Sequence, residues 1–233
     1  MSAARLLLRA GAGAAAAWGL YAWGAHLATS GSVWRGARGR RRVALTFDDG
    51  PDPEWTPRVL ALLAERRVRG SFFLVGARAA RTPDLVRRIA AAGHEIGNHG
   101  WAHRSLWLCG PRRTSVEIGR CQEVLADLTG RAPALFRPPW GMVNAAMFPL
   151  LRQHGLRCVF WTIQPEGLVP VSAPLQTRRL VRRARPGAIV DLHDAPGLPG
   201  APARLCEALP AMIDGLRRAD YAFATVGELL EER

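Results

Sequence analysis

The sequence predicts a single α/β domain in which seven parallel strands form a β/α barrel, preceded by an N-terminal hydrophobic segment. The first observation is size, because 233 residues, about half of them apolar, can bury one sizeable core. The second is that short apolar runs alternate with helix-like stretches from Val43 onward. This alternation indicates a mainly parallel sheet, and seven strands suggest its closure into a barrel. We find no internal repeat and no second domain.

Apolar runs are the expected strands, at residues 43–47, 71–75, 95–98, 135–137, 158–161, 188–192 and 221–225. Helical patterns cover residues 55–66, 85–92, 115–128, 144–154, 175–183 and 203–218. Thr82 is expected to cap the second of these helices, with Pro83 in its first turn. In such a barrel, the chemistry collects at the C-terminal ends of the strands.

Two segments precede the expected domain at residues 43–233. The 19 residues from Ala10 to Ala28 carry no formal charge and follow two arginines, which suits a single membrane span. A cleaved signal peptide is the alternative, although no clear cleavage site appears. The arginines downstream also argue against a cytoplasmic N-terminus. We expect residues 1–30 to be a membrane anchor or signal segment, which places the protein at the membrane or outside the cytoplasm of a bacterial-type cell envelope. Residues 31–42 are expected to be a flexible basic linker.

The positive charge is large, but it does not indicate a nucleic-acid partner. All 32 basic residues are Arg, and the net charge is +13. A basic patch can bind nucleic acid or anionic lipid, yet no recognition motif and no interleaved aromatic residues accompany these arginines. The four cysteines contain no C-x-x-C pair, so thiolate metal binding is not expected.

Ionisable residues gather at the C-terminal ends of the expected strands. Asp48 and Asp49 end the first strand, His99 the third, Arg137 the fourth and His193 the sixth. Solvated charges placed at random would scatter over both ends of the barrel. These residues therefore predict an active site at this end.

The segment N-H-G-W-A-H supplies candidate metal ligands, because His99 and His103 stand four residues apart. If the chain turns helical after His99, both imidazoles share one face. Two His and one carboxylate, with positions open for water, is a recurring catalytic zinc arrangement. A divalent cation bound by Asp48 or Asp49 would also offset the repulsion between these neighbours. The spacing alone also suits a surface or core His pair, but together with the adjacent carboxylates it favours a metal.

Five motifs resemble those of one family in their order: T-F-D-D-G-P (46–51), G-H-E-I-G-N-H (93–99), H-G-W-A-H (99–103), R-P-P-W-G (137–141) and L-H-D (192–194). They look like the motifs of the polysaccharide deacetylases, the NodB-like carbohydrate esterases, and the resemblance covers roughly residues 40–230. It implies a distorted β/α barrel. It also implies metal-dependent hydrolysis of N-acetyl groups on an aminosugar polymer, with Zn²⁺ as the expected ion.

The resemblance implies a role for each motif residue. Asp49, His99 and His103 would ligate the metal, Asp48 would be the general base, Arg137 its ion-pair partner and His193 the general acid. Amide hydrolysis needs these functions, since water must be activated, an oxyanion stabilised and the departing amine protonated. The backbone N–H of Trp140, in a loop stiffened by prolines, is the expected oxyanion donor. Pro139 and Leu192 are expected beside the substrate.

Two departures from the family pattern concern the general acid. The fourth motif normally carries a carboxylate followed by Trp, but this chain reads W-T-I-Q-P-E-G-L (161–168), where Glu166 is the only carboxylate. Asp191 also stands where an apolar residue is usual. Alternation along a strand puts Asp191 and His193 on one face, so we expect Asp191 to supply the missing carboxylate. A polar acyl pocket and a backbone-bonded Asp191 are the alternatives, and Glu166 is the remaining candidate partner.

The leading hypothesis is a metal-dependent deacetylase of an N-acetylated glycan or a related amide. The second is a catalytically impaired glycan-binding barrel that retains the metal site, which is favoured if no carboxylate reaches His193. A basic nucleic-acid or lipid adaptor would require the arginines to cluster away from the cleft. The motifs leave open which glycan is bound.

Overall fold

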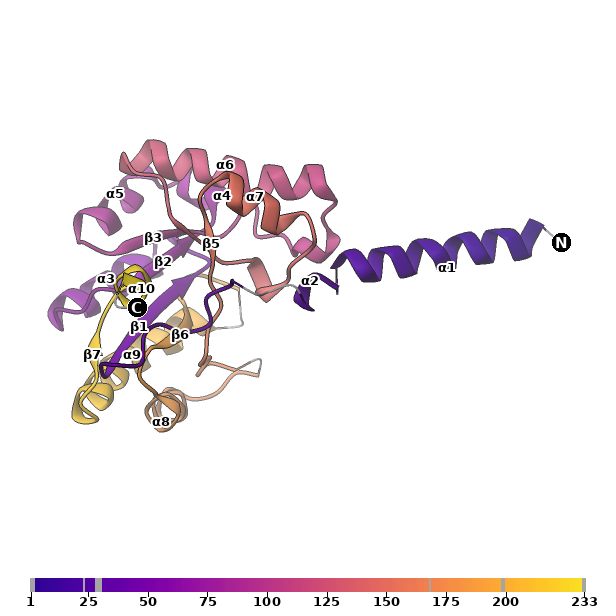
Figure 1. The fold of residues 1–233 in the computed structure, drawn as a ribbon. Helices are drawn as coiled ribbons and strands as arrows, with labels where there is room; N and C mark the ends of the chain where they lie inside the picture. Colours follow the sequence, from indigo (N-terminus) through magenta and orange to yellow (C-terminus); the bar gives the residue numbers. More distant parts are fainter. Residues whose placement is uncertain (1–2, 23, 28–30, 168, 198–199, 232–233) are drawn as a thin grey trace.

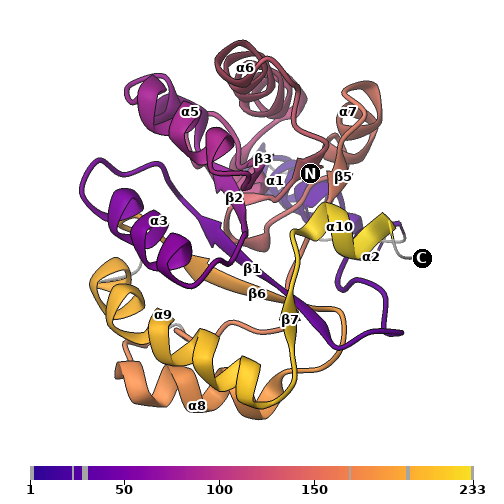
Figure 2. The ribbon, with the colours of Figure 1, turned by 90° about the vertical axis from the view of Figure 1, so that its left-hand side faces the viewer.

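The barrel is confirmed in a computed structural model, which describes residues 3–22, 24–27, 31–167, 169–197 and 200–231. Its strands pair in the order β5-β4-β3-β2-β1-β6, and β7 pairs with β1. Every pair is parallel. The bounds are β1 Arg42–Asp48, β2 Ser71–Leu74, β3 Glu95–Asn98, β4 Leu135–Phe136, β5 Arg157–Cys158, β6 Ala188–His193 and β7 Ala222–Phe223. Figure 2 shows the helices arranged around these strands.

The barrel closes between β5 and β6 by an isolated bridge instead of a full ladder, and this makes it distorted. Residues after β5 reach β6, where Ile163 bridges Val190. The N–H of Asp191 donates to the carbonyl oxygen of Ile163 at 2.8 Å. β6 pairs with β1 over its whole length, with Asp48 opposite His193. The two strands that carry most of the expected chemistry are thus neighbours.

Helices cover the outside of the sheet where the sequence predicts them. The expected patterns correspond to α3 Trp55–Glu65, α5 Pro83–Ala91, α6 Pro111–Thr129, α7 Met147–Gln153, α8 Ala173–Arg183 and α9 Ala201–Arg218. The short elements α4 Gly76–Ala79, η1 Leu106–Leu108, η2 Pro139–Gly141 and α10 Val226–Glu231 were not predicted, because so few turns show no periodicity. Pro83 begins α5 as predicted, but the hydroxyl of Thr82 donates to Arg78 and makes no cap bond.

Strand alternation divides the core into two layers. Outward side chains such as Leu45 and Leu192 belong to the large apolar cluster that also contains residues of α3, α8 and α9. Inward side chains such as Ala44 and Ile189 form a second cluster, and α10 adds its apolar residues to it. Further along β1 the inner face becomes polar, beginning with the buried Thr46. The polar end of this inner face is where the site forms.

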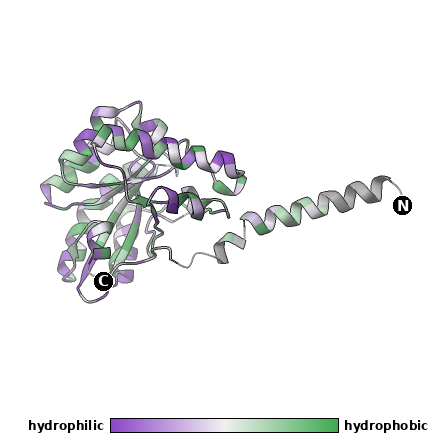
Figure 3. Ribbon diagram, turned by 45° about the horizontal axis from the view of Figure 1, so that its top comes forward, coloured by the Kyte–Doolittle hydropathy of each residue, from purple (hydrophilic) through white to green (hydrophobic). Residues whose placement is uncertain are grey.

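The N-terminal segment is a helix, α1 (Ala3–Ala22), which projects from the barrel and is followed by α2 (Gly24–Leu27) (Figures 1 and 3). Within the described part of the chain, no helix combines the length and apolarity that crossing a bilayer requires. The α1 segment is rich in Ala and Gly, whose small side chains add little apolar surface. The expected transmembrane helix thus has no counterpart among the described helices, and the assignment of residues 1–30 as an anchor or signal segment stays a prediction. The end of α1 contacts the barrel, because the Tyr21 hydroxyl donates to the carbonyl oxygen of Cys109 at 3.1 Å.

The segment expected to be a flexible linker is instead paired with the barrel. Val33 is buried and bridges Val159 beside β5. Its N–H donates to the carbonyl oxygen of Cys158 at 2.8 Å, and its carbonyl oxygen accepts from the N–H of Phe160 at 2.7 Å. Further on, the N–H of Gly36 donates to Gly187 and that of Ala37 to Leu229. The sequence alone could not predict this pairing, because the partners are remote in the chain and residues 31–42 show locally only a basic, Gly-rich composition.

Candidate active site

Asp48 and Asp49 enter one cleft at the C-terminal end of β1. Asp48 is the last residue of the strand and lies on its inner face, in register with His193. Strand alternation alone would turn Asp49 outward, but its backbone is left-handed, with φ at 74°. Both carboxylates therefore line the same cavity and both are buried. Two buried carboxylates require positive partners.

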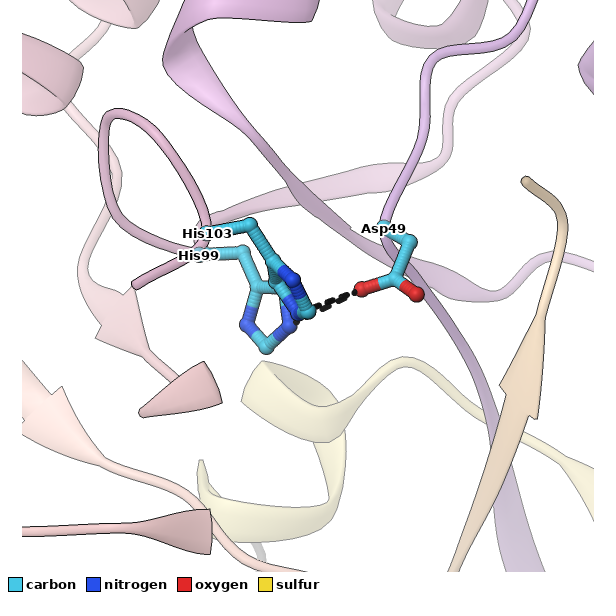
Figure 4. A group of neighbouring side chains, drawn as sticks. All are labelled: Asp49, His99 and His103. Atoms are coloured by element: carbon cyan, nitrogen blue, oxygen red, sulfur yellow. Dashed lines mark ion pairs between the residues drawn. The ribbon is translucent and has the colours of Figure 1, made fainter. Parts of the chain in front are cut away.

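His99 and His103 reach Asp49 from the loop after β3 (Figure 4). Nε2 of His103 lies 2.8 Å from Asp49 Oδ1, and Nε2 of His99 lies 3.4 Å from the same atom. The loop is not helical, so the helical explanation of their four-residue spacing is wrong. Gly100 and His103 instead take left-handed conformations, with φ of 80° and 52°, and the loop folds back on itself.

The chemistry of this group fits a cation. Nδ1 of His99 lies 2.8 Å from the carbonyl oxygen of Arg137, so this nitrogen carries the proton and Nε2 presents a lone pair. The buried Oδ1 of Asp49 faces the Nε2 atoms of both histidines, which pair with it in the space that an ion would occupy. The three ligand atoms lie within 4.8 Å of one another, a donor set that suits Zn²⁺ or a similar ion. Burial lowers the pKa of His99, but the carboxylates of Asp48 and Asp49 raise it above its ordinary value, so the position favours positive charge.

Arg137 is fully buried and organises the floor of the cleft. Its Nη1 donates to Asp48 Oδ1 at 2.7 Å, to Thr46 Oγ1 at 2.7 Å and to Asp191 Oδ1 at 3.3 Å. Its other nitrogens donate to carbonyl oxygens of the segment after β5, and the guanidinium stacks 4.1 Å from the Phe73 ring centroid. A buried guanidinium requires this many partners. Its position beside Asp48 agrees with the role that the family resemblance implies.

The partner of His193 is Glu166. Nδ1 of His193 lies 2.5 Å from Glu166 Oε2, and the His193 N–H donates to Glu166 Oε1 at 3.2 Å. Burial lowers the pKa of His193, while the charge of Asp191 and the hydrogen bond to Glu166 raise it well above 6.5. The expected hydrogen-bonding role of Asp191 therefore falls to Glu166, because the loop before α8 carries this carboxylate over the end of β6.

Asp191 faces the cleft as expected, but its ion pair is with Arg137. It is almost fully buried, and β6 places it opposite Thr46 of β1. Burial and the neighbouring Asp48 charge raise the pKa of Asp191 to about 8, although His193 and Arg137 lower it. Asp191 acts on His193 through charge, without contacting it by a hydrogen bond among the described residues.

These side chains surround a cavity of about 100 Å³. The expected oxyanion donor, Trp140, lines it and takes a left-handed conformation, with φ at 62°. The amides of Gly141 and Met142 donate to carbonyl oxygens, whereas no described residue accepts a hydrogen bond from the Trp140 N–H. Further lining residues are Asp48, Asp49, His99, His103, Pro138, Trp161, Gln164, Asp191, His193 and Gly197.

Two expected substrate residues lie outside this lining. Leu192 is fully buried in the outer apolar cluster, because alternation along β6 turns it away from the face that carries Asp191 and His193. Pro139 is buried, and Pro138 takes its place in the cavity wall. The position of Leu192 outside the cavity lining therefore speaks against the expected contact with the substrate.

Comparison with known proteins agrees with this geometry. The family model described as polysaccharide deacetylase matches residues 35–159. This chain belongs to the polysaccharide deacetylase family. It is 32% identical over 199 residues to a peptidoglycan-N-acetylglucosamine deacetylase of Bacillus cereus, covering 85% of this chain and 72% of that protein. It is 34% identical over 184 residues to a chitooligosaccharide deacetylase of Bradyrhizobium, covering 78% of this chain and 83% of that protein.

The fold of this polysaccharide deacetylase is also that of solved relatives. A crystal structure of a peptidoglycan N-acetylglucosamine deacetylase superposes with a TM-score of 0.82 and 31% sequence identity. The match covers 86% of this chain and 93% of the solved one. The recognition of the family from its motifs is confirmed.

Several residues of this deacetylase's site were missed by the sequence analysis. Gln164 lines the cavity from the loop after β5. A Cβ at Gly197 would lie 2.1 Å from Asp49 Oδ2, so any other residue here would have to displace that carboxylate. Arg78 donates to the carbonyl oxygens of Asp49 and Pro196, at 2.9 and 3.0 Å, and ties the two loops together. Gln164 stands in the fourth-motif stretch 161–168, but the local sequence around Arg78 and Gly197 does not mark them, since each acts on a remote segment.

Proposed function

We propose that this protein hydrolyses N-acetyl groups on an N-acetylglucosamine-containing glycan, with a divalent metal ion as cofactor. The observation that supports it best is the convergence of three side-chain groups on one cavity. These are the Asp49, His99 and His103 ligand set, the Asp48–Arg137 pair and the His193–Glu166 pair. The names of the relatives point to glycans of the same class. Such a substrate fits a cell-envelope location outside the cytoplasm, which we also propose.

Asp49, His99 and His103 would hold the ion, for which Zn²⁺ is the best match to two imidazoles and one carboxylate. When bound there, the ion would lower the pKa of water and polarise the substrate carbonyl. The Arg137 carbonyl fixes the His99 ring, so that its Nε2 faces the site without rearrangement.

Asp48 is the proposed general base. Its Oδ1 accepts from Arg137 at 2.7 Å, and this charge-assisted hydrogen bond holds the side chain in one orientation. Its Oδ2 lies 3.7 Å from His99 Nε2, on the side of the ligand set. Asp48 can therefore accept a proton from water held beside Asp49.

His193 is the proposed general acid for the departing amine. Its Nδ1 bonds to Glu166, so Nε2 is the atom that delivers a proton. The raised pKa of His193 keeps the imidazolium form available at neutral pH. The unpartnered N–H of Trp140 is the proposed oxyanion donor, and the left-handed turn at this residue gives it its orientation.

The alternative of a catalytically impaired glycan-binding barrel is not favoured. It requires that no carboxylate reaches His193, but Glu166 contacts both the ring and the backbone N–H of this residue.

The test is an assay of acetate release. Purified protein, stripped of metal and then reloaded with Zn²⁺, is incubated with N-acetylglucosamine oligomers and with peptidoglycan. We expect acetate from at least one substrate, dependent on added metal. A protein that binds these glycans in the presence of Zn²⁺ but releases no acetate would support the binding-module alternative.

A further inference from the structure

A second hollow, which we call the aromatic groove, adjoins the active-site cavity. It has a volume of about 520 Å³, and its lining consists of Gly141 and six large side chains: Trp34, Trp107, Trp140, Met142, Phe160 and Trp161. Trp140 and Trp161 also line the cavity that contains the ligand set. The Trp140 ring lies 5.1 Å from the His103 ring, so the groove begins where the cavity ends.

The outer part of the groove is built by the N-terminal segment. Trp34 stacks on Phe160, with ring centroids 4.1 Å apart and planes 10° apart. Its neighbour Val33 bridges Val159, which fixes the backbone of Trp34 against the barrel. Trp34 is nevertheless 46% exposed and Trp140 is 55% exposed. Two large rings thus keep about half of their surface in solvent, and packing alone does not require this arrangement.

We propose that the aromatic groove is a sugar-binding subsite, which holds the pyranose ring next to the one whose N-acetyl group enters the cavity. This inference rests on the proposed function. A cavity of about 100 Å³ has room for an acyl group and little more, so the rest of a polymeric substrate must lie on the adjoining surface. The groove shares Trp140 and Trp161 with that cavity, and its volume is typical of a ligand site.

The chemistry of the lining selects a sugar. The face of an indole ring carries partial negative charge, and the axial C–H groups of a pyranose carry partial positive charge, so the two stack. The hydroxyl groups lie at the edge of the sugar ring and remain in water, because the exposed faces of Trp34 and Trp140 leave the groove open. An alkyl chain would gain most from complete enclosure, which half-exposed rings do not provide.

The subsite goes beyond what family membership implies. The family model begins at residue 35, so Trp34 lies outside the match. The bridge between Val33 and Val159 and the stacking of Trp34 on Phe160 together hold the exposed Trp34 ring in the groove beside the active-site cavity.

Chain-length dependence tests the proposal. The kcat/KM values for N-acetylglucosamine dimer and hexamer are measured for wild type, Trp34→Ala and Trp34→Phe. We expect Trp34→Ala to lower the hexamer-to-dimer ratio by about tenfold, and Trp34→Phe to keep most of it, because Phe retains a stacking face. Trp18→Ala is the matched control, since Trp18 is 45% exposed and lies on α1 outside the groove. A ratio that Trp34→Ala leaves unchanged, or an equal loss on both substrates, would overturn the proposal.

Trp107→Ala serves as a second variant in case Trp34→Ala fails to fold, and we expect the same direction. Binding is also measured without turnover, by calorimetry in an Asp48→Asn background, with the hexamer and with farnesyl phosphate. We expect Trp34→Ala to weaken binding of the hexamer about tenfold. Weakened binding of farnesyl phosphate alone would assign the groove to a lipid and overturn the proposal. These binding results remain decisive if no substrate releases acetate, so failure of the proposed function is distinguishable from failure of the subsite.

Discussion

The two walls of the cleft use the same residue types in opposite ways. On one wall, Nδ1 of His99 meets a backbone carbonyl, so its Nε2 keeps a lone pair directed at Asp49. On the other wall, Nδ1 of His193 meets the carboxylate of Glu166, which raises the pKa of the ring. A neutral partner prepares an imidazole to bind a cation, whereas an ionised partner prepares it to carry a proton. The group that contacts Nδ1 thus decides which chemistry each imidazole is suited to.

The largest effect is expected from removing the two histidines of the candidate metal-ligand set. His99→Ala combined with His103→Ala should abolish both stoichiometric zinc binding and acetate release, because Asp49 alone cannot hold the ion. Metal analysis of the purified variant checks this. His154→Ala, at an exposed histidine far from the cleft, is the control and should retain zinc. A double variant that still binds a full equivalent of zinc would contradict the assignment.

Asp48→Asn should have the next largest effect. We expect kcat to fall by about 10²–10⁴ while the zinc content is kept, because the base is lost and the ligands remain. Steady-state kinetics and metal analysis of the same preparation give both values. Unchanged turnover would show that another group accepts the proton.

Glu166→Gln tests whether the charge of Glu166 raises the pKa of His193. The amide keeps the shape of the side chain but removes its charge, so the pKa of His193 should fall. Because the acid must be protonated, the basic limb of the pH–rate profile should move to lower pH, and kcat at neutral pH should fall by about ten- to hundredfold. Glu123→Gln, on the exposed face of α6, controls for loss of one negative charge. A basic limb that does not move would exclude Glu166 as the tuning group.

Asp191→Leu should have a smaller effect of the same sign. Asp191 is ion-paired with Arg137 at 3.3 Å and makes no hydrogen bond to His193 among the described residues, so it acts on the ring less directly than Glu166 does. We expect a shift of the basic limb in the same direction as for Glu166→Gln, but smaller. If Asp191 instead shapes the acyl pocket, the preference between N-acetyl and bulkier N-acyl substrates will change while the pH profile stays in place. If Asp191→Leu moves the basic limb further than Glu166→Gln does, Asp191 has the stronger effect on the pKa of His193 and this prediction is wrong.

Asp52→Ala should change stability and leave the chemistry intact. Asp52 follows Asp48 and Asp49 closely in the chain, but its Oδ1 accepts from the N–H groups of Glu54 and Trp55 at the start of α3, at 2.9 Å each. Losing this cap should cost about 1 kcal/mol of unfolding free energy. Urea denaturation measures it, and kcat serves as the second readout. A large fall in kcat with unchanged stability would place Asp52 in the mechanism.

The sequence by itself determined the strand order along the chain and which strand residues share a face. Alternation along β6 correctly placed Asp191 and His193 in the cleft, and the same alternation excludes Leu192. The motifs also singled out Asp49, His99 and His103 as candidate ligands, and the structure brings these three side chains together. These signals are local, so the chain displays them before it folds.

Tertiary structure decided which partner each of these residues meets. Asp49 reaches the cleft only through its left-handed backbone. Glu166, not Asp191, reaches the His193 ring from a loop 27 residues away, and Arg137 reaches Asp48 across 89 residues. The basic segment around Val33 pairs beside β5 although its composition resembles a linker. Such contacts depend on how loops cross the end of the barrel, and the free energy that selects those paths comes from packing between remote segments, which no local pattern encodes.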